Sequence, residues 1–160
     1  AAFRKGDKAL ALAAYTNGVN LSFDLLTTDY DSRIPLSKKI TPASKAAYMA
    51  DPKVIPTSAA NLTLSMIMLQ KYIALYGYGF HETWTDMRRY HYTDIDPATG
   101  NQVYAGFTLP TVLHVYNAGK LAYRARPRYN SEYLYNIPAL QVIGALASDY
   151  HTKEHWFMQP

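Results

Sequence analysis

The chain has 160 residues, of which 49% are hydrophobic and 18% charged, which excludes disorder as its main state and suffices for a buried core. Cysteine is absent, so disulfides and cysteine-based metal sites are excluded. The net charge of +4 does not indicate nucleic-acid binding, because the basic residues are scattered among acidic ones and form no stripe interleaved with aromatic side chains.

The first predicted element is a helix that begins at Asp7, a residue typical of a helix N-cap. Ala9, Leu10 and Ala13 follow, and apolar residues continue at helical spacing. Spaced alanines after Gly-Asp resemble one half of a tetratricopeptide repeat, in which small residues let two helices approach closely. Since no second copy of the repeat is present, we expect its first helix to lie upstream and the Ala9/Leu10/Ala13 face to be exposed.

Residues 27–56 contain four prolines among polar residues, which predicts a long loop. One short helix is expected within it, from Pro42 to Met49. Thr41 would be its N-cap, and proline would occupy the first helical position.

The next predicted helix runs from Ser58 to Tyr76, where apolar residues form a continuous stripe with a second apolar side next to it. We therefore expect this helix to be buried on more than one face and to end at Gly77. The stripe comprises Leu62, Met66, Leu69, Ile73 and Tyr76.

A tryptophan, two carboxylates and paired arginines follow within a short segment, and their spacing predicts a further helix. Glu82, Asp86 and Arg89 would share one face, because residues three and four apart are neighbours on a helix. Trp84 and Arg88 are also four apart, so that a guanidinium can lie over the indole ring. We interpret the cluster as a local knot of ion pairs and stacking.

A hairpin-like excursion is predicted between Tyr92 and Tyr104, around a turn of the sequence Asp-Pro-Ala-Thr-Gly. After a loop-rich stretch, Ser131 is expected to cap a short helix that runs toward Ala147. The tail, residues 156–160, is aromatic, and we expect it to dock on the body of the protein.

Three blocks carry a family resemblance. Residues 64–75 contain Gln-Lys-Tyr-Ile-Ala-Leu, residues 82–89 read E-x-W-x-D-x-R-R, and residues 126–132 precede Asn136 in a third block. The first two are similar to signatures of the SusD/RagB family, nutrient-binding lipoproteins of the Bacteroidetes outer membrane, and the third is similar to its R-x-x-Y-x-x-x-E-x-x-x-N block. Because members are much longer, the resemblance implies that residues 1–160 are the C-terminal part of a single SusD-like domain.

The resemblance implies a mainly α fold with tetratricopeptide-like helical packing, long loops and the small β-hairpin-like excursion. It implies non-enzymatic capture of an extracellular nutrient, most of all a glycan and otherwise a peptide, for delivery to a SusC-like TonB-dependent transporter. It also implies a place on the surface of the outer membrane, anchored by an N-terminal lipid that is absent from this chain. No cofactor is implied.

Candidate ligand-binding side chains come from the residues themselves. Flat aromatic rings pack on the apolar faces of sugars, while neighbouring polar groups bind the hydroxyls. Aromatic residues gather around the most loop-like stretch of the chain, beside charged residues. They are Tyr78, Tyr90, Tyr92, Tyr104 and Phe107. Packing in the core is the alternative interpretation for each of them.

The sequence supports a metal site less well than it supports the aromatic ligand-binding candidates. Residues 151–155 match the H-x-x-E-H motif of zinc proteases, which would pair His151 and His155 as ligands, but no third ligand follows. Asp94 and Asp96 lack the ligand spacing of a calcium loop, which favours a turn stabilised by Asx side chains. We predict no metal site.

Catalysis is not predicted either. The arginines beside Glu82 and Asp86 would keep both carboxylates ionised, which does not suit a general acid. The alternative to nutrient capture is a helical-repeat scaffold that binds a protein partner and no small ligand.

Overall fold

The computed structural model describes residues 1–159, except for the side chain of Asp31. Pro160, which ends both the predicted domain and the predicted aromatic tail, lies outside the described residues. The chain divides into two compact units: unit 1 comprises residues 1–84 and 94–106, and unit 2 comprises residues 85–93 and the chain from residue 107 onward. That the chain is the C-terminal part of a single, longer domain stays a prediction.

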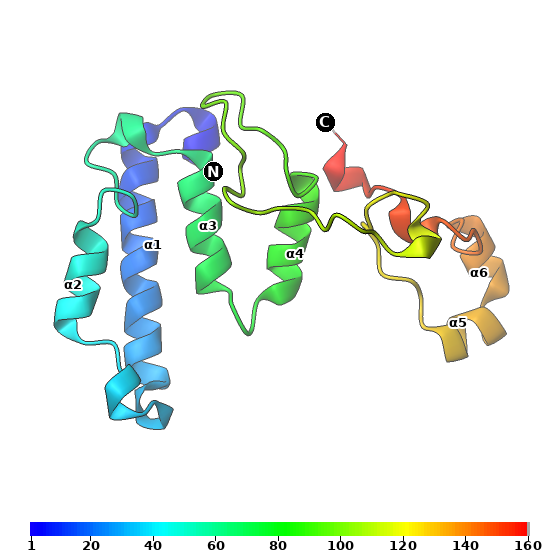
Figure 1. Cartoon of the computed structure of the whole chain (residues 1–160), viewed down its shortest axis with the longest axis horizontal. Helices are drawn as coiled ribbons and strands as arrows, with labels where there is room; N and C mark the ends of the chain where they lie inside the picture. Colours follow the sequence, from blue (N-terminus) through cyan, green and yellow to red (C-terminus); the bar gives the residue numbers. More distant parts are fainter. Residues whose placement is uncertain (160) are drawn as a thin grey trace. The chain divides into compact units, whose positions relative to one another are not determined.

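Helices dominate the described chain and long loops connect them, which confirms the predicted mainly α fold class (Figure 1). Unit 1 holds η1 (Phe3–Lys5), α1 (Lys8–Asp29), η2 (Asp31–Arg33), η3 (Leu36–Lys38), α2 (Pro42–Ala50), η4 (Ala59–Asn61) and α3 (Leu64–Ala74). The boundary between the units falls inside α4 (Phe80–Arg89). Unit 2 holds η5 (Val115–Asn117), α5 (Tyr129–Tyr135), α6 (Ile137–Val142), η6 (Tyr150–Thr152) and η7 (Trp156–Met158). Within residues 1–159, no helix is long and apolar enough to span a membrane.

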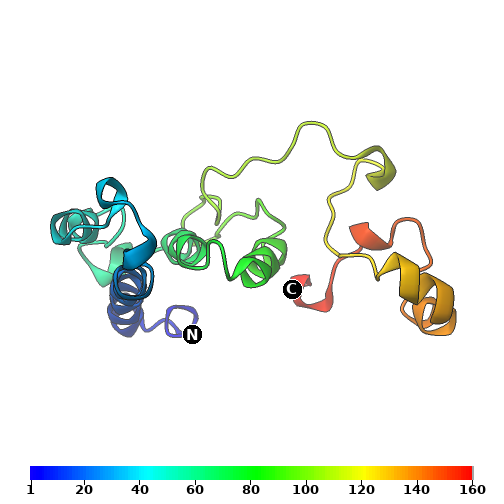
Figure 2. The ribbon, with the colours of Figure 1, turned by 90° about the horizontal axis from the view of Figure 1, so that it is seen from below.

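In unit 1, α1 lies beside α3 on one side and α2 on the other, and Figure 2 shows the three helices nearly end-on. Phe23 of α1 meets Tyr48 of α2 edge to face, with ring centroids 5.2 Å apart. The Tyr48 hydroxyl in turn accepts a hydrogen bond from the Gln70 amide of α3 at 2.7 Å. Gln70 belongs to the first signature block, so this block joins α3 to α2.

The predicted N-caps Asp7 and Thr41 are confirmed. The Asp7 carboxylate accepts a hydrogen bond from the Leu10 amide at 3.0 Å at the start of α1. Thr41 and Ser44 form a reciprocal capping box at the start of α2, where Pro42 occupies the first turn as predicted. These side chains satisfy backbone donors that a helix start leaves without partners.

The predicted exposed face of α1 is also confirmed. Ala9, Leu10 and Ala13 are all exposed, and the exposed fraction of Leu10 is 57%. Ala11 and Val19 are buried, so the helix turns a different side toward the rest of unit 1.

The predicted bounds and burial of the third helix were wrong. α3 begins at Leu64 rather than Ser58, because Thr63 is extended and its hydroxyl accepts the Met66 amide at 3.2 Å. The helix is not buried on more than one face: Met68 is buried, but the predicted stripe residues Ile73 and Tyr76 are 56% and 79% exposed. In the chain after α3, Gly77 adopts a φ of 88°, which agrees with the predicted stop.

The predicted hairpin-like excursion is present in unit 1 as one antiparallel bridge between Ile95 and Gln102. The Asp96 carboxylate accepts the Ala98 amide at 3.0 Å and the Thr99 hydroxyl at 3.3 Å. This is the Asx-stabilised turn that we preferred to a calcium loop. Val103 and Tyr104, which follow the bridge, are 1% and 3% exposed and anchor the excursion in the core of unit 1.

Unit 2 has a small core of Leu140, Ala145 and Tyr150. The prediction that Ser131 caps a helix toward Ala147 was wrong, because α5 begins two residues earlier and a separate helix, α6, follows it. The predicted docking of the aromatic tail is only partly confirmed: Met158 is buried in this unit, whereas Trp156 is 83% exposed.

The cap of α1 gives a first prediction. Replacing Asp7 by Ala leaves the Leu10 amide without its acceptor and should lower the free energy of unfolding by about 1 kcal/mol. Urea unfolding followed by far-UV circular dichroism measures the loss. Asp7→Ser is the control, since its hydroxyl can accept the same bond; an equal loss in both variants would contradict the capping role.

Candidate functional site

The C-terminal half of α4, in unit 2, carries buried charged side chains that are hydrogen-bonded or paired. Asp86, 5% exposed, forms an ion pair with Arg89 at 3.2 Å. Arg88, 7% exposed, donates to the Tyr123 carbonyl at 2.7 Å and to the Thr85 hydroxyl at 3.0 Å. Burial is the main cause that lowers the pKa of Arg88 from its ordinary value. These contacts support the structural interpretation of the E-x-W-x-D-x-R-R signature over an acid–base pair.

Two successive residues then adopt left-handed backbone conformations. His91 has a φ of 43° and Tyr92 a φ of 66°. The Tyr92 amide donates to the Met87 carbonyl at 2.8 Å and the His91 amide to the Arg88 carbonyl at 2.9 Å. This is the hydrogen-bond pattern of a Schellman motif, in which glycine usually takes the left-handed position. A non-glycine residue there costs about 1–2 kcal/mol, and such strain is concentrated at functional sites.

Directly after this turn, the Tyr92 ring is part of a stack of three aromatic rings, all in unit 2. Its ring lies between Phe107, at a centroid distance of 6.1 Å and an interplanar angle of 23°, and Tyr123, at 5.8 Å and 15°. The Tyr92 hydroxyl donates to the Ala122 carbonyl at 2.7 Å. All three rings are half-buried, so the stack presents part of its surface to solvent. We call Tyr92, Phe107 and Tyr123 the aromatic stack.

A histidine–carboxylate contact borders the aromatic stack. The His91 ring meets the Tyr123 ring edge-on at 6.1 Å, and its Nε2 lies 3.4 Å from a carboxylate oxygen of Glu154. The two side chains are 31% and 43% exposed. A flat apolar surface with polar groups at its edge is the arrangement that a sugar ring requires.

The five aromatic residues predicted to bind ligand lie in different environments. Tyr92 and Phe107 come together in the aromatic stack, and Tyr90 is half-buried at the end of α4. Tyr78 lies in unit 1, is 52% exposed, and donates its hydroxyl proton to the Ala74 carbonyl at 2.5 Å. Tyr104 also lies in unit 1 and is buried, which favours the packing interpretation for it. Sequence reasoning missed Tyr123, since an isolated tyrosine in a distant loop gives no signal of its own.

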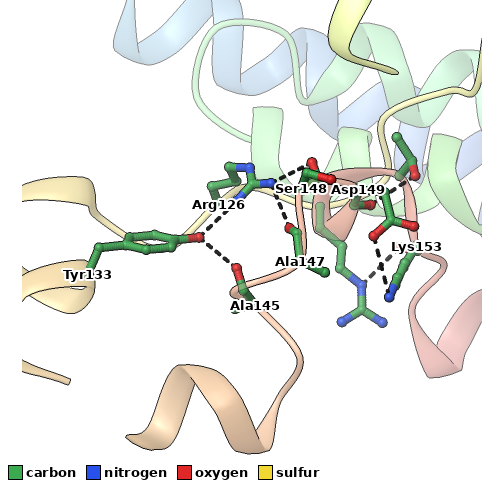
Figure 3. Close-up of polar contacts among 9 residues, drawn as sticks. Arg126, Tyr133, Ala145, Ala147, Ser148, Asp149 and Lys153 are labelled. Carbon is green, nitrogen blue, oxygen red and sulfur yellow. Dashed lines mark hydrogen bonds and ion pairs between the residues drawn. The ribbon is translucent and has the colours of Figure 1, made fainter. Parts of the chain in front are cut away.

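The third signature block clamps the C-terminal part of unit 2, as Figure 3 shows. The Arg126 guanidinium donates to the Tyr133 hydroxyl at 2.9 Å and to the Ala147 and Ser148 carbonyls at 2.8 and 2.6 Å. The Tyr133 hydroxyl donates to the Ala145 carbonyl at 2.9 Å. These hydrogen bonds connect α5 and the loop before it to residues 145–148.

A second arginine holds the segment that carries the edge carboxylate. Arg124 donates to the Lys153 carbonyl at 2.8 Å and to the Glu154 carbonyl. Lys153 also pairs with Asp149 at 3.5 Å (Figure 3). The position of Glu154 beside His91 therefore depends on backbone contacts that Arg124 makes.

The zinc-protease hypothesis is not supported by the backbone. Lys153, between the two histidines of the motif, is extended, so they do not share a helical face. His151 Nε2 lies 2.9 Å from the Asn117 amide oxygen, and Glu154 pairs with His91. Among residues 1–159, no group of three or more potential metal ligands is gathered.

Unit 1 contains an apolar groove between α1 and α3, with a volume of about 580 Å³. We call it the α1–α3 groove. Tyr15 lines it and donates its hydroxyl proton to the Val54 carbonyl at 2.7 Å. Apolar side chains dominate the lining, among them Val19, Phe23 and Ile67. Such a surface does not suit a glycan, which needs many hydrogen-bonding partners.

Comparison with known proteins gives one family. Residues 6–112 match the SusD-like family, described as starch-binding and associating with the outer membrane. The match covers more than half of the chain and includes the first two signature blocks, while the third lies outside it. The chain matches no curated protein and no solved structure.

The groove tyrosine gives a pH-dependent prediction. Burial, and to a lesser extent Tyr48, raises the pKa of Tyr15 from 10.0 to about 12. The unfolded chain therefore loses this proton first, so the stability that the neutral hydroxyl contributes is present below pH 10 and lost between pH 10 and about 12. We expect the urea midpoint to fall more steeply over this range in the wild type than in Tyr15→Phe. Parallel pH profiles would contradict the prediction, because all other titrating groups are common to both proteins.

Proposed function

The chain belongs to the SusD-like family, described as starch-binding and associating with the outer membrane, and we propose that it captures an extracellular glycan there. The captured glycan passes to a SusC-like TonB-dependent transporter. A lipid at the N-terminus of the full-length protein holds it at the cell surface, and a peptide is the alternative nutrient. The function is binding without catalysis.

The aromatic stack is the observation that supports this proposal most directly. In our proposal, the apolar face of a sugar ring packs on an end ring of the aromatic stack, Phe107 or Tyr123, because the Tyr92 ring between them is covered by both. The His91–Glu154 pair binds hydroxyl groups at the edge. Both kinds of contact form without any bond being made or broken.

The strained turn at the end of α4 is a second argument for the stack. Glycines at positions 91 and 92 would allow the same turn without strain, and the chain has His91 and Tyr92 there. His91 supplies the polar group beside the rings. The backbone hydrogen bonds of the turn hold both side chains in place before a ligand arrives, which lowers the entropy cost of binding.

Glycan capture is tested with soluble starch and a pool of maltooligosaccharides, by titration calorimetry on the full-length protein. We expect saturable binding, and we expect a TonB-dependent transporter to co-purify with the tagged protein from its own membranes. Binding of a peptide pool, with no binding of the glycans, would show that the captured nutrient is a peptide. Failure to bind either pool, with no transporter recovered, would exclude nutrient capture.

The site itself is tested by Tyr92→Ala. Loss of the central ring should weaken glycan binding about tenfold, which corresponds to about 1.4 kcal/mol. Tyr92→Phe keeps the ring and should bind like the wild type. Tyr116→Ala is the matched control, because Tyr116 is a 79% exposed tyrosine of unit 2 outside the aromatic stack. If Tyr92→Ala remains folded by circular dichroism and binds normally, the glycan lies elsewhere.

A further inference from the structure

Trp156 exposes its side chain to solvent although the backbone around it is fixed. The residue is 83% exposed, whereas Met158, two positions later, is buried. The Met158 sulfur accepts a hydrogen bond from the His155 amide at 3.4 Å, and the His155 side chain accepts one from the Met158 amide. Because Trp156 lies between these two residues, its indole ring is presented to solvent from a short segment that is tied down on both sides.

Phe157 supports the exposed indole. The two rings meet at a centroid distance of 5.9 Å and an interplanar angle of 83°. The His155 ring stacks on Phe157 at 5.0 Å and 11°, and the guanidinium groups of Arg88 and Arg89 lie 5.4 and 6.0 Å from the centre of the Phe157 ring. These contacts hold Phe157 in place and thereby help to orient Trp156.

An indole that is held in place and exposed is typical of a binding surface. A tryptophan side chain contributes most to stability when it is buried, because its large apolar area then leaves water. At a binding surface, a fixed aromatic ring offers a large contact area and loses little conformational freedom when a ligand arrives. The exposure of Trp156 therefore favours a role in binding over a role in packing.

The polar groups at this surface suit a sugar. The indole N–H can donate to a hydroxyl group. Burial, and to a lesser extent the charges of Arg124 and Arg88, lowers the pKa of His155 from its ordinary value of 6.5, so the ring is mainly neutral at pH 7. One of its nitrogens accepts the Met158 amide, which leaves the proton on the other nitrogen as a donor. An acyl chain would accept neither donor, so a sugar fits this surface better than a lipid.

Trp156 is close to the aromatic stack, because Glu154 belongs to the edge of that stack. The Glu154 carboxylate contacts His91, whose ring meets the Tyr123 ring edge-on. Trp156 follows Glu154 by two residues, so the Cα atoms of the two are at most about 7 Å apart. The edge of the stack and the indole thus lie in the same unit and within the span of one oligosaccharide.

We propose that Trp156 is a second aromatic subsite for glycan, on which one sugar unit packs while another unit of the same chain lies on the aromatic stack. This inference rests on the proposed function and names the class of its ligand: a chain of several sugar units rather than a single sugar. Two subsites that hold one ligand act together, because binding at the first raises the effective concentration at the second.

The subsite is tested by titration calorimetry of the full-length protein with maltose and with maltoheptaose. We expect the wild type to bind the longer chain more tightly, and Trp156→Ala to weaken maltoheptaose binding about tenfold while maltose binding changes little. Trp156→Phe keeps an aromatic ring and should lose less affinity than Trp156→Ala. Tyr135→Ala is the matched control, because Tyr135 is an aromatic residue of unit 2 with the same exposure, 84%.

The outcomes separate this inference from the proposed function. If the wild type binds glycan and Trp156→Ala, folded by circular dichroism, binds both ligands equally well, the second subsite is overturned while glycan capture stands. If the wild type binds no glycan, glycan capture and the second subsite are both overturned. If Trp156→Ala keeps its glycan affinities and no longer co-purifies with the transporter, Trp156 belongs to a protein interface, which also overturns the subsite.

Fluorescence quenching tests the contact directly. The exposed Trp156 indole is accessible to acrylamide, and the difference in quenching between the wild type and Trp156→Phe reports on this side chain. Saturating maltoheptaose should remove most of that difference, because a sugar unit then covers the indole. An undiminished difference with the ligand bound would overturn the subsite.

Discussion

Backbone carbonyl groups in long loops need hydrogen-bond donors, and side chains of tyrosine, lysine and arginine supply them in both units. In unit 1, Tyr15 bonds the Val54 carbonyl and Lys8 bonds the Leu62 carbonyl. In unit 2, Arg88 bonds the Tyr123 carbonyl and Tyr92 the Ala122 carbonyl, and further arginines bond the C-terminal segment. The carbonyls of Val54, Leu62 and Tyr123 are bonded at part-buried positions, where an unpaired backbone group would be costly, and the others at exposed ones. These donors therefore help to fix the paths of the loops. The 15 tyrosines suit this task, since each combines an apolar ring with a polar tip.

The same constraint connects the signature blocks with the candidate binding surface. Arg88 is buried at the end of α4 and bonds the loop that carries Tyr123, while the Schellman turn after it directs Tyr92 onto the Tyr123 ring. The signature residues thus have a positioning role, and the surface proposed for ligand lies one turn beyond them. The signature and the proposed ligand surface are adjacent but distinct, so the motif can indicate the family without naming a ligand.

Local interactions were readable from the sequence. The caps at Asp7 and Thr41 and the turn at Asp96 bond partners two or three residues away, so the residue types and their spacing were sufficient. The mainly α fold class and the family followed from helical spacing and from short signature blocks, which are also local. The exposed face of α1 was predicted because its small and apolar residues lacked a matching helix in the chain.

The bounds of α3, the burial of its side chains and the turn after α4 depend on the tertiary structure and not on local sequence pattern. The helix predicted from Ser58 begins only at Leu64, after the N-cap Thr63, and Ile73 of the predicted apolar stripe stays 56% exposed. The sequence alone did not indicate that His91 would take a left-handed conformation or that Tyr92 would stack on Tyr123. Both depend on contacts between segments far apart along the chain, and residue spacing carries no information about which distant segments meet.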